Sequence, residues 1–306
     1  MHVLLTGATG NSGRHLLTAL LAGGHRVTAV QRIAHDALPG PDLGSDRLRW
    51  VRQDLAQGTG ALPLDYDVVI HTAAHAPPRA VSAAAHVTHN IIATRNLVEH
   101  AARRAGRRFI FLSSISVLGR ISVPEVDETT ASQSPGSYGL SKLVGEQLLA
   151  EAGPRLAAVS LRLPGIVGTG GVGPWIEHIY GDIRAQRSFR VHSLDHPFNN
   201  FIPITDLAAF TLQLMDRLQP GHDVLTLAAV EPLPLHRVIE EFALASGVEA
   251  KPVVLPATQP AFTISSQRAI TCYGYAPLSV YAAIARLTGT TVPSLSPASF
   301  IPSFSQ

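Results

Sequence analysis

Short apolar runs and amphipathic segments alternate along the first half of this 306-residue chain. Leucines at helical spacing over 14–22, and helical patterns over 87–102 and 138–151, separate runs that predict strands. The predicted strands are 2–5, 26–30, 48–51, 67–70, 108–112 and 157–163. Apolar strands that alternate with helices are typical of a parallel sheet covered on both faces. The pattern therefore predicts an α/β fold built on a doubly wound parallel sheet.

This rhythm breaks after Pro164. Five glycines follow within the next nine residues. A short helix is then predicted over 175–185, 187–200 is irregular, and strand and helix patterns return over 201–218 and 224–228. We therefore expect a dinucleotide-binding domain and a smaller substrate-binding lobe. The first would comprise 1–164 with 201–228 returning to it, and the second 165–200 and 229–306, which ends in a Ser/Pro-rich tail.

A glycine-rich turn joins the first predicted strand to the first predicted helix. Gly7, Gly10 and Gly13 form G-x-x-G-x-x-G there. Glycine lets the backbone approach a pyrophosphate, and the helix N-terminus supplies N–H groups and a positive dipole end. A tight turn without a ligand is the alternative, but a place inside a βαβ unit favours nucleotide binding. The predicted cofactor-binding residues of the turn are Gly7, Thr9, Gly10, Asn11, Ser12 and Gly13.

The end of the second predicted strand, where an adenosine ribose would lie, carries Gln31 and Arg32 instead of an acid. An arginine can pair with a 2′-phosphate, so Arg32 favours NADP(H). Arg32 as a solvated residue that stacks on adenine is the alternative, and it leaves NAD(H) open. After the third strand, Asp54, followed by Leu55, could accept from the adenine amine or serve as a loop acid or helix cap.

A phenol and an ammonium lie on one face of the predicted helix 138–151. Tyr138 and Lys142 are four residues apart and therefore neighbours on that face. A nearby positive charge stabilises a phenolate, so we expect Lys142 to lower the pKa of Tyr138 and to make it a proton donor and acceptor near neutral pH. Ser114, at the end of the fifth strand, could hydrogen-bond the same substrate oxygen. Pairs of this kind also arise by chance on helices, so this pair indicates a catalytic site only in combination with the glycine-rich turn.

Together these motifs make the chain resemble the extended short-chain dehydrogenases/reductases, the NAD(P)-dependent epimerase/dehydratase family. The resemblance spans nearly the whole chain, in the family's order, and implies a Rossmann fold. It rests on 6–13 (TGATGNSG), Asp54, 67–74 (DVVIHTAA), 90–101 (NIIATRNLVEHA), 111–119 (FLSSISVLG), 138–146 (YGLSKLVGE), 161–164 (LRLP), 201–208 (FIPITDLA) and 266–277 (SQRAITCYGYAP).

Carried over position by position, the resemblance implies that Tyr138 is the general acid/base and that Lys142 holds the nicotinamide ribose. It also implies that Ser114, rather than Ser113, orients the substrate oxygen. Asn90 would be a cofactor contact or, equally, a packing or capping residue. Further cofactor contacts are implied at Thr72, Ala73, Ala74 and Pro164.

Some positions depart from the family's pattern. Sugar-nucleotide dehydratases need an acid pair directly after the position of Ser114, whereas this chain has Ile115 and Ser116. Nucleotide-sugar epimerases usually place arginines for the substrate diphosphate at the positions of Asn199 and Thr271. The departures argue against dehydration and weaken the case for a nucleotide-sugar substrate. Candidate replacement cations, or ordinary surface charges, are Arg187, Arg190 and Arg268. An apolar pocket, or the core of the lobe, could be formed by Trp175, Phe189, Phe198 and Phe262.

The composition narrows the choice of partners. The formal charge is only +2 and no charged run dominates, so we expect no nucleic-acid partner. No apolar run reaches the roughly 18 residues of a membrane span, and Met1 leads directly into the first strand without a signal peptide. We therefore expect a cytoplasmic protein that makes no membrane contact. With one cysteine, Cys272, and no metal-ligand spacing, we expect no metal. The chain has only two lysines, Lys142 and Lys251.

The expected function is that of an NAD(P)-dependent oxidoreductase or epimerase that transfers hydride at a secondary alcohol or ketone of a small molecule. Two alternatives stay open: a nucleotide-sugar 4-epimerase with tightly bound NAD, and a non-catalytic dinucleotide-sensing regulator on the same fold. The helices 87–102 and 138–151 could pair two chains into a homodimer. Substrate identity, and the choice between reductase and epimerase, stay open at this level.

Overall fold

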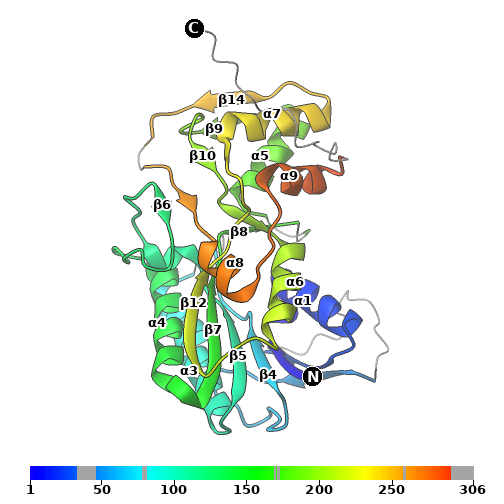
Figure 1. Ribbon diagram of the computed structural model, residues 1–306, viewed down its shortest axis with the longest axis vertical. Helices are drawn as coiled ribbons and strands as arrows, with labels where there is room; N and C mark the ends of the chain where they lie inside the picture. The colour runs from blue at the N-terminus through cyan, green and yellow to red at the C-terminus, as the bar shows by residue number, and fades with distance from the viewer. Residues whose placement is uncertain (33–45, 78–80, 169, 171–172, 258–259, 291–306) are drawn as a thin grey trace.

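A computed structural model describes residues 1–32, 46–77, 81–168, 170, 173–257 and 260–290. Within these residues, seven parallel strands form one sheet in the order β12-β7-β5-β4-β1-β2-β3 (Figure 1). The order reverses between β1 and β4, and the ends of these two strands mark where ligands bind in open α/β sheets. The strands are β1 (His2–Thr6), β2 (Arg26–Gln31), β3 (Leu48–Arg52), β4 (Val68–His71), β5 (Arg107–Leu112), β7 (Leu156–Arg162) and β12 (Gly221–Thr226).

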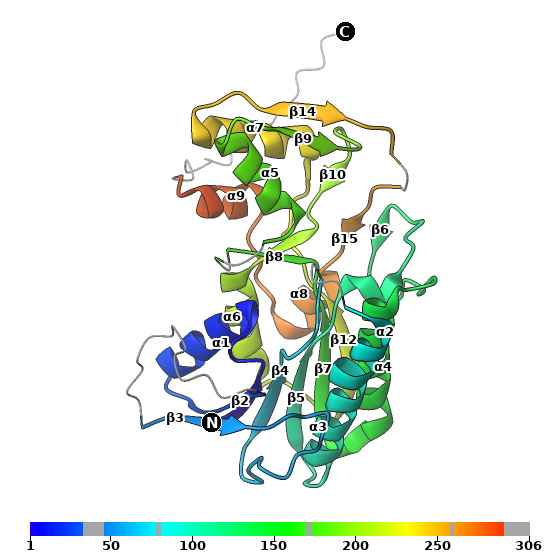
Figure 2. The same cartoon turned by 180° about the vertical axis from the view of Figure 1, so that it is seen from behind.

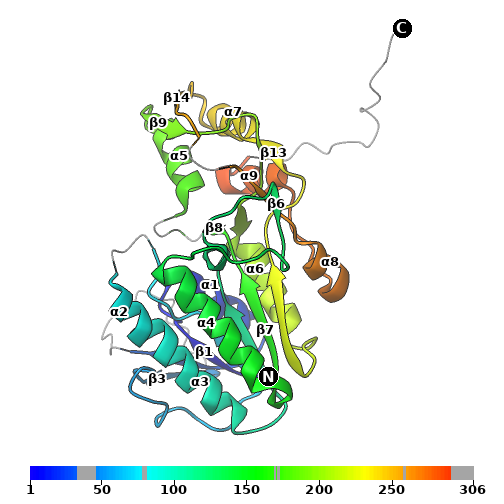
Figure 3. The same cartoon turned by 90° about the vertical axis from the view of Figure 1, so that its left-hand side faces the viewer.

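Helices cover both faces of the sheet, as the doubly wound prediction requires. α1 (Asn11–Ala22) and α6 (Ile204–Leu214) pack on one face, and α3 (Ala93–Ala102) and α4 (Ser137–Ala152) lie side by side on the other (Figure 3). The pleat of a strand directs successive side chains to opposite faces. Accordingly, Val3 and Leu5 join the core beneath α1, whereas Leu4 joins the core beneath α3. The predicted fold class is confirmed.

The predicted helix 87–102 begins earlier than its pattern indicates and is not uniformly α-helical. It starts as α2 (Ala83–His86), passes through one π-helical segment, η1 (Val87–Ile92), and continues as α3. Ser82 begins it, because its side chain accepts a hydrogen bond from the N–H of Ala85 at 3.2 Å. Neither the cap nor the wider turn leaves a signal in the spacing of apolar residues.

A third hydrophobic core lies in the part of the chain predicted to form a lobe. The elements of this part lie beyond the carboxyl ends of the strands (Figure 2). We call this part the upper lobe. It contains α5 (Trp175–Arg184), α7 (Leu235–Ser246), α9 (Val280–Thr288), β9 (Ser188–Val191), β10 (Pro197–Phe198), β13 (Leu233–Pro234) and β14 (Lys251–Val254). The remaining elements are β6 (Glu125–Val126), β8 (Gly165–Val167), β11 (Phe201–Pro203), β15 (Thr263–Ile264), α8 (Gln267–Tyr273), η2 (Ile115–Leu118) and η3 (Gly153–Arg155).

The lobe boundaries expected from the sequence stay a prediction, and one element qualifies them. α8 lies within 229–306 but packs against β12. Its Ala269, and Tyr275 just after it, belong to the core of the sheet. No helix within the described ranges is both long and apolar enough to cross a membrane.

Candidate active site

A cavity of about 430 Å³ lies at the carboxyl ends of β1, β4, β5 and β7. Of the residues predicted from the sequence, those that line it are Thr9, Gly10, Asn11, Ser12, Gly13, Thr72, Ala74, Ser114, Tyr138, Lys142 and Pro164. Those outside its lining are Gly7, Arg32, Asp54, Leu55, Ala73 and Asn90. Lining residues that the sequence did not single out are Ala76, Pro77, Leu112, Ser113, Leu163 and Ile166. We call it the cofactor cavity.

The glycines of the turn have two different roles. Gly7 has φ +70°, and a Cβ there would lie 2.6 Å from the backbone nitrogen of Ala73. A Cβ on Gly13 would collide with the carbonyl oxygen of Gly7. These two glycines close the turn, whereas a Cβ on Gly10 would meet only that oxygen, at 3.2 Å, and would face the cavity.

The polar groups around the turn suit a dinucleotide. α1 begins at the N-cap Gly10, which has no side chain to accept a hydrogen bond from the first amides, so these amides are available for a diphosphate. Within the described residues, Oε1 of Gln31, at the end of β2, is buried and lacks a hydrogen-bond partner. It can accept a bond from a cofactor hydroxyl. The residues present therefore fit NAD(P), with the diphosphate at 10–13 and the adenosine toward β2.

Lys142 is only 3% exposed. Its Nζ donates a 2.6 Å hydrogen bond to the carbonyl oxygen of Leu112 and lies 4.6 Å from the ring centroid of Phe111. Burial lowers the pKa of Lys142 to about 7, although the charge of Glu146 acts in the opposite direction. The one buried lysine thus sits against the end of β5, beside Ser113 and Ser114.

The expected lowering of the Tyr138 pKa by Lys142 is wrong for this structure. Burial raises the pKa of Tyr138 to about 12, and a hydrogen bond with the Ser114 side chain only partly opposes this. The Lys142 ammonium lies 6.0 Å from the tyrosine ring and is bonded to Leu112. Residue spacing correctly placed the two groups on one face, but it does not reveal how deeply each is buried.

The two serines after β5 point in different directions. Ser113 is buried, and its hydroxyl donates to Oε1 of Glu146 at 2.5 Å. Ser114 lines the cofactor cavity, and its Oγ accepts from the N–H of Ser116 at 3.1 Å. The preference for Ser114 agrees with this geometry, and its catalytic role stays a prediction.

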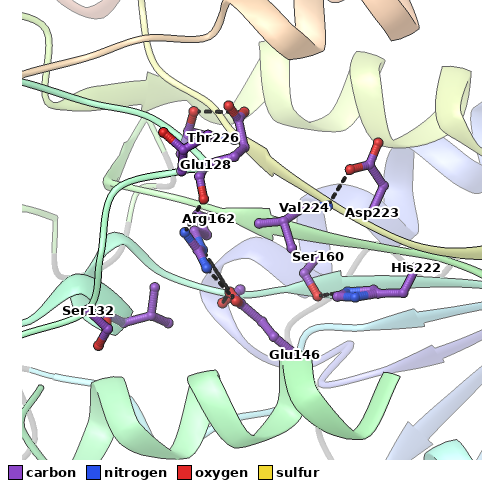
Figure 4. Close-up of polar contacts among 12 residues, drawn as sticks. Glu128, Ser132, Glu146, Ser160, Arg162, His222, Asp223, Val224 and Thr226 are labelled. Atoms are coloured by element: carbon purple, nitrogen blue, oxygen red, sulfur yellow. Dashed lines mark hydrogen bonds and ion pairs between the residues drawn. The ribbon is translucent and has the colours of Figure 1, made fainter. Parts of the chain in front are cut away.

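A buried ion pair supports the wall behind Lys142 and Ser113. Glu146 on α4 contacts Arg162 on β7 at 2.8 Å, with both side chains nearly inaccessible (Figure 4). Arg162 also donates to the carbonyl oxygen of Glu128, whose carboxylate accepts from the N–H of Thr226 on β12 at 2.7 Å. The network joins one helix, two strands and a loop. Sequence analysis missed it, although Glu146 stands four residues after Lys142.

The remaining predicted contacts are engaged with protein groups. Asp54 accepts from the N–H of Ala56 at 3.0 Å within a turn, and no described helix begins there, which is the loop-acid alternative. The amide of Asn90 bonds both backbone groups of His75 and the hydroxyl of Ser141, which is the packing alternative. Leu55 is buried, and its carbonyl oxygen accepts from Asn96. The backbone N–H of Ala73 donates to Thr6 Oγ1 at 3.4 Å. Their cofactor roles stay predictions.

Arg32 lies beside two histidines. Its Nη1 is 3.2 Å from Nε2 of His75 and 3.4 Å from Nδ1 of His89. The two imidazoles have ring centroids 4.5 Å apart. A cationic side chain at the end of β2 is thus surrounded by further nitrogen groups.

Comparison with known proteins identifies the family. Residues 3–225 match the model of the NAD dependent epimerase/dehydratase family, and the chain belongs to that family. Sterol demethylase protein B of Methylococcus capsulatus is 29% identical over 71% of this chain and 66% of its own length. D-erythronate dehydrogenase of Cupriavidus necator is 32% identical over 54% of this chain and 55% of its own length. UDP-glucose 4-epimerase of Erwinia amylovora is 25% identical over 81% of this chain and 83% of its own length.

The chain thus spans about half to two thirds of the length of the first two relatives named. Among solved structures, MoeE5 in complex with UDP-glucuronic acid and NAD aligns with a TM-score of 0.76 at 23% identity, over 94% of this chain and 98% of its own. A putative epimerase from Burkholderia cenocepacia aligns with a TM-score of 0.78 at 21% identity, over 94% and 96%. These likenesses establish the fold. The predicted family is confirmed. The relatives named above include a dehydrogenase and an epimerase.

Proposed function

We propose that this protein transfers hydride between a nicotinamide cofactor and a secondary alcohol or ketone, with Tyr138 as the general acid/base. The observation that carries the proposal is the convergence of Tyr138, Ser114 and Lys142 on a cavity that also contains the glycine-rich turn. A non-catalytic regulator would need the turn and Lys142 to hold a dinucleotide, but it would not need Tyr138 and Ser114 beside them in the same cavity.

The side chains have distinct tasks in this mechanism. The cofactor, when bound, supplies or accepts the hydride. Ser114 donates a hydrogen bond to the substrate oxygen and fixes its position. Burial raises the pKa of Tyr138 to about 12, so its hydroxyl is protonated at neutral pH and carries the proton that the substrate oxygen would accept during reduction. Lys142 would hold the nicotinamide ribose.

We propose NADP(H) as the preferred cofactor, with NAD(H) as the alternative. Arg32, with His75 and His89 beside it, supports recognition of a 2′-phosphate. The two described residues at the end of β2, Gln31 and Arg32, carry no carboxylate that would repel a phosphate.

A nucleotide-sugar 4-epimerase with tightly bound NAD is the second candidate. The match to UDP-glucose 4-epimerase of Erwinia amylovora supports it, because that match extends over more than four fifths of both chains. An epimerase keeps its cofactor and returns the hydride to the other face of the substrate, whereas a reductase must exchange its cofactor.

Cofactor identity and turnover together test the proposed function. Nucleotide released from protein purified without additives is identified by mass, and hydride transfer is followed by absorbance of the reduced nicotinamide. An empty site with NADPH-dependent reduction of a ketone supports the reductase. Retained NAD with interconversion of two sugar epimers supports the second candidate. Binding of the nucleotide without turnover of any alcohol, ketone or sugar contradicts both.

We also propose a homodimer formed through α3 and α4, in a cytoplasmic protein. Leu140 on α4 and Val87 at the start of η1 are about half exposed, and these apolar side chains would be covered by a partner chain. Gel filtration with light scattering tests the dimer, and a monomeric mass contradicts it.

A further inference from the structure

A groove leads from Tyr138 into the upper lobe. One cavity of about 750 Å³ shares Ser114 and Tyr138 with the cofactor cavity and reaches Trp175 and Phe262. A second, of about 280 Å³, also touches Trp175 and Phe262 and continues deeper into the lobe. Because the two cavities share these walls, we treat them as one groove, the substrate cleft.

Three aromatic side chains of the upper lobe and its neighbouring loops, Trp175, Phe198 and Phe262, line the substrate cleft. Trp175, the first residue of α5, is 44% exposed although it is large and apolar. It packs edge-on against Phe198, with ring centroids 5.8 Å apart. An indole left open inside a concave groove indicates an apolar ligand surface that would cover it.

The described residues that line the substrate cleft include no arginine or lysine. The three candidate replacement cations do not supply one. Arg187 forms an ion pair with Asp182 at 2.8 Å, and Arg268 bonds both carboxylate oxygens of Asp223 at 2.9 Å. Arg190 is exposed on β9 and is not among the lining residues. A diphosphate in this cleft would lose its water without gaining a guanidinium or ammonium from the described walls.

Asn199 is also unable to meet a substrate. Its side chain is 2% exposed and makes three hydrogen bonds to the backbone. Nδ2 donates to the carbonyl oxygens of Ala229 and Ile264, and Oδ1 accepts from the N–H of Ile264. The side chain therefore joins two segments of the protein and has no free group for a ligand.

Two residues that line the substrate cleft each carry a buried polar atom that forms no hydrogen bond with the described residues. Nε2 of His196 and Oδ1 of Asn200 are buried and have no hydrogen-bond partner among the described residues. Both residues line the deeper cavity, away from Tyr138. A buried polar atom without a partner is costly, and a ligand hydroxyl can bond either of these atoms.

We propose that the substrate is an uncharged, predominantly apolar molecule that carries its reacting hydroxyl or ketone at one end and a second hydroxyl at the other. The reacting group lies at Tyr138 and Ser114, the apolar body lies against Trp175, and the second hydroxyl meets His196 and Asn200. This assignment rests on the proposed function and names the substrate class of the same site.

Three probes test the substrate class: 2-decalone, a decalone with a hydroxyl on its far ring, and UDP-glucose. Each is assayed for NAD(P)H oxidation, and its binding is followed by the fluorescence of Trp175, with Trp175→Phe as the variant that removes the signal. We expect both decalones to be reduced and to bind. We expect KM for the hydroxydecalone to be at least about 10-fold lower than KM for 2-decalone. In His196→Leu we expect the two KM values to become equal.

Two variants locate the apolar body of the substrate. Trp175→Ala is expected to raise KM for 2-decalone at least about 10-fold with little change in kcat. Leu244→Ala removes an apolar side chain that is 78% exposed on α7, outside the cleft, and should leave KM unchanged. Equal effects of the two variants would contradict the assignment.

The outcomes separate the substrate class from the proposed function. Turnover or tight binding of UDP-glucose overturns the substrate class and leaves hydride transfer intact. Binding of the decalones without any reduction supports the substrate class and overturns the proposed function. Failure of both decalones to bind overturns the substrate class.

Discussion

The Nζ of Lys142 lies 2.6 Å from the carbonyl oxygen of Leu112, the last residue of β5. The contact holds the ammonium at the floor of the cofactor cavity, where a broad guanidinium would displace its neighbours. Lys142→Arg should therefore lose at least about 100-fold in kcat/KM and keep the native circular dichroism spectrum. Lys251→Arg is the matched control, because Lys251 is the other lysine and is exposed. Normal turnover by Lys142→Arg would exclude a specific role for the ammonium.

Burial of Lys142 gives the folded protein a distinct pH dependence. Its pKa falls from 10.5 to about 7, so between these values the unfolded chain binds a proton that the folded protein does not. Stability from this group is therefore complete above about pH 10.5 and is lost as the pH falls through about 7. Tyr138 acts oppositely, but only above about pH 10, because its pKa is raised from 10.0 to about 12.

Urea unfolding of the wild type and of Lys142→Met between about pH 7 and about pH 9.5 measures this dependence. The difference in unfolding free energy, wild type minus variant, should rise with pH at no more than about 1.4 kcal/mol per pH unit. A flat or falling difference means that Lys142 is not desolvated in solution.

Two substitutions in the glycine-rich turn distinguish an effect on cofactor binding from an effect on folding. Gly10→Ala adds a methyl group that faces the cavity, so the variant should fold with a Tm close to the wild type but bind NADPH at least about 10-fold more weakly. Gly13→Ala forces a collision with the Gly7 carbonyl and should lower Tm clearly. Gly60→Ala is the control, since a Cβ at Gly60 meets nothing within 4 Å. Equal NADPH affinity in Gly10→Ala and the wild type would exclude this turn as the diphosphate site.

Arg32 decides the cofactor preference in this account. Arg32→Glu removes the cation for a 2′-phosphate and adds a carboxylate suited to a ribose hydroxyl, so the Kd for NADPH should rise at least about 10-fold while that for NADH stays or falls. Arg190→Glu makes the same charge change on β9 and should alter neither value. If the ratio of the affinities for NADPH and NADH is the same in Arg32→Glu as in the wild type, Arg32 is a solvated residue that does not set the cofactor preference.

Most of the fold could be predicted from the sequence, because each apolar run such as 108–112 has the length of a buried strand and is followed by a helical pattern. Most of the residues that line the cofactor cavity could be predicted for a related reason, since motifs directly after parallel strands meet at one edge of the sheet. The pKa of Tyr138 could not, because it depends on burial rather than on spacing. The Glu146–Arg162 ion pair could not be predicted either, because it joins two separate elements of the fold. The same holds for the unpartnered atoms of Gln31, His196 and Asn200, because their burial depends on how the chain packs around them.

The proposed reaction depends on proton transfer by the hydroxyl of Tyr138. The direct test is turnover by Tyr138→Phe with the first ketone that the wild type reduces, with NADPH affinity measured on the same samples. Loss of at least about 100-fold in kcat, with unchanged NADPH affinity and Tm, is the predicted result. Full turnover by Tyr138→Phe would show that another group supplies the proton and would contradict the account.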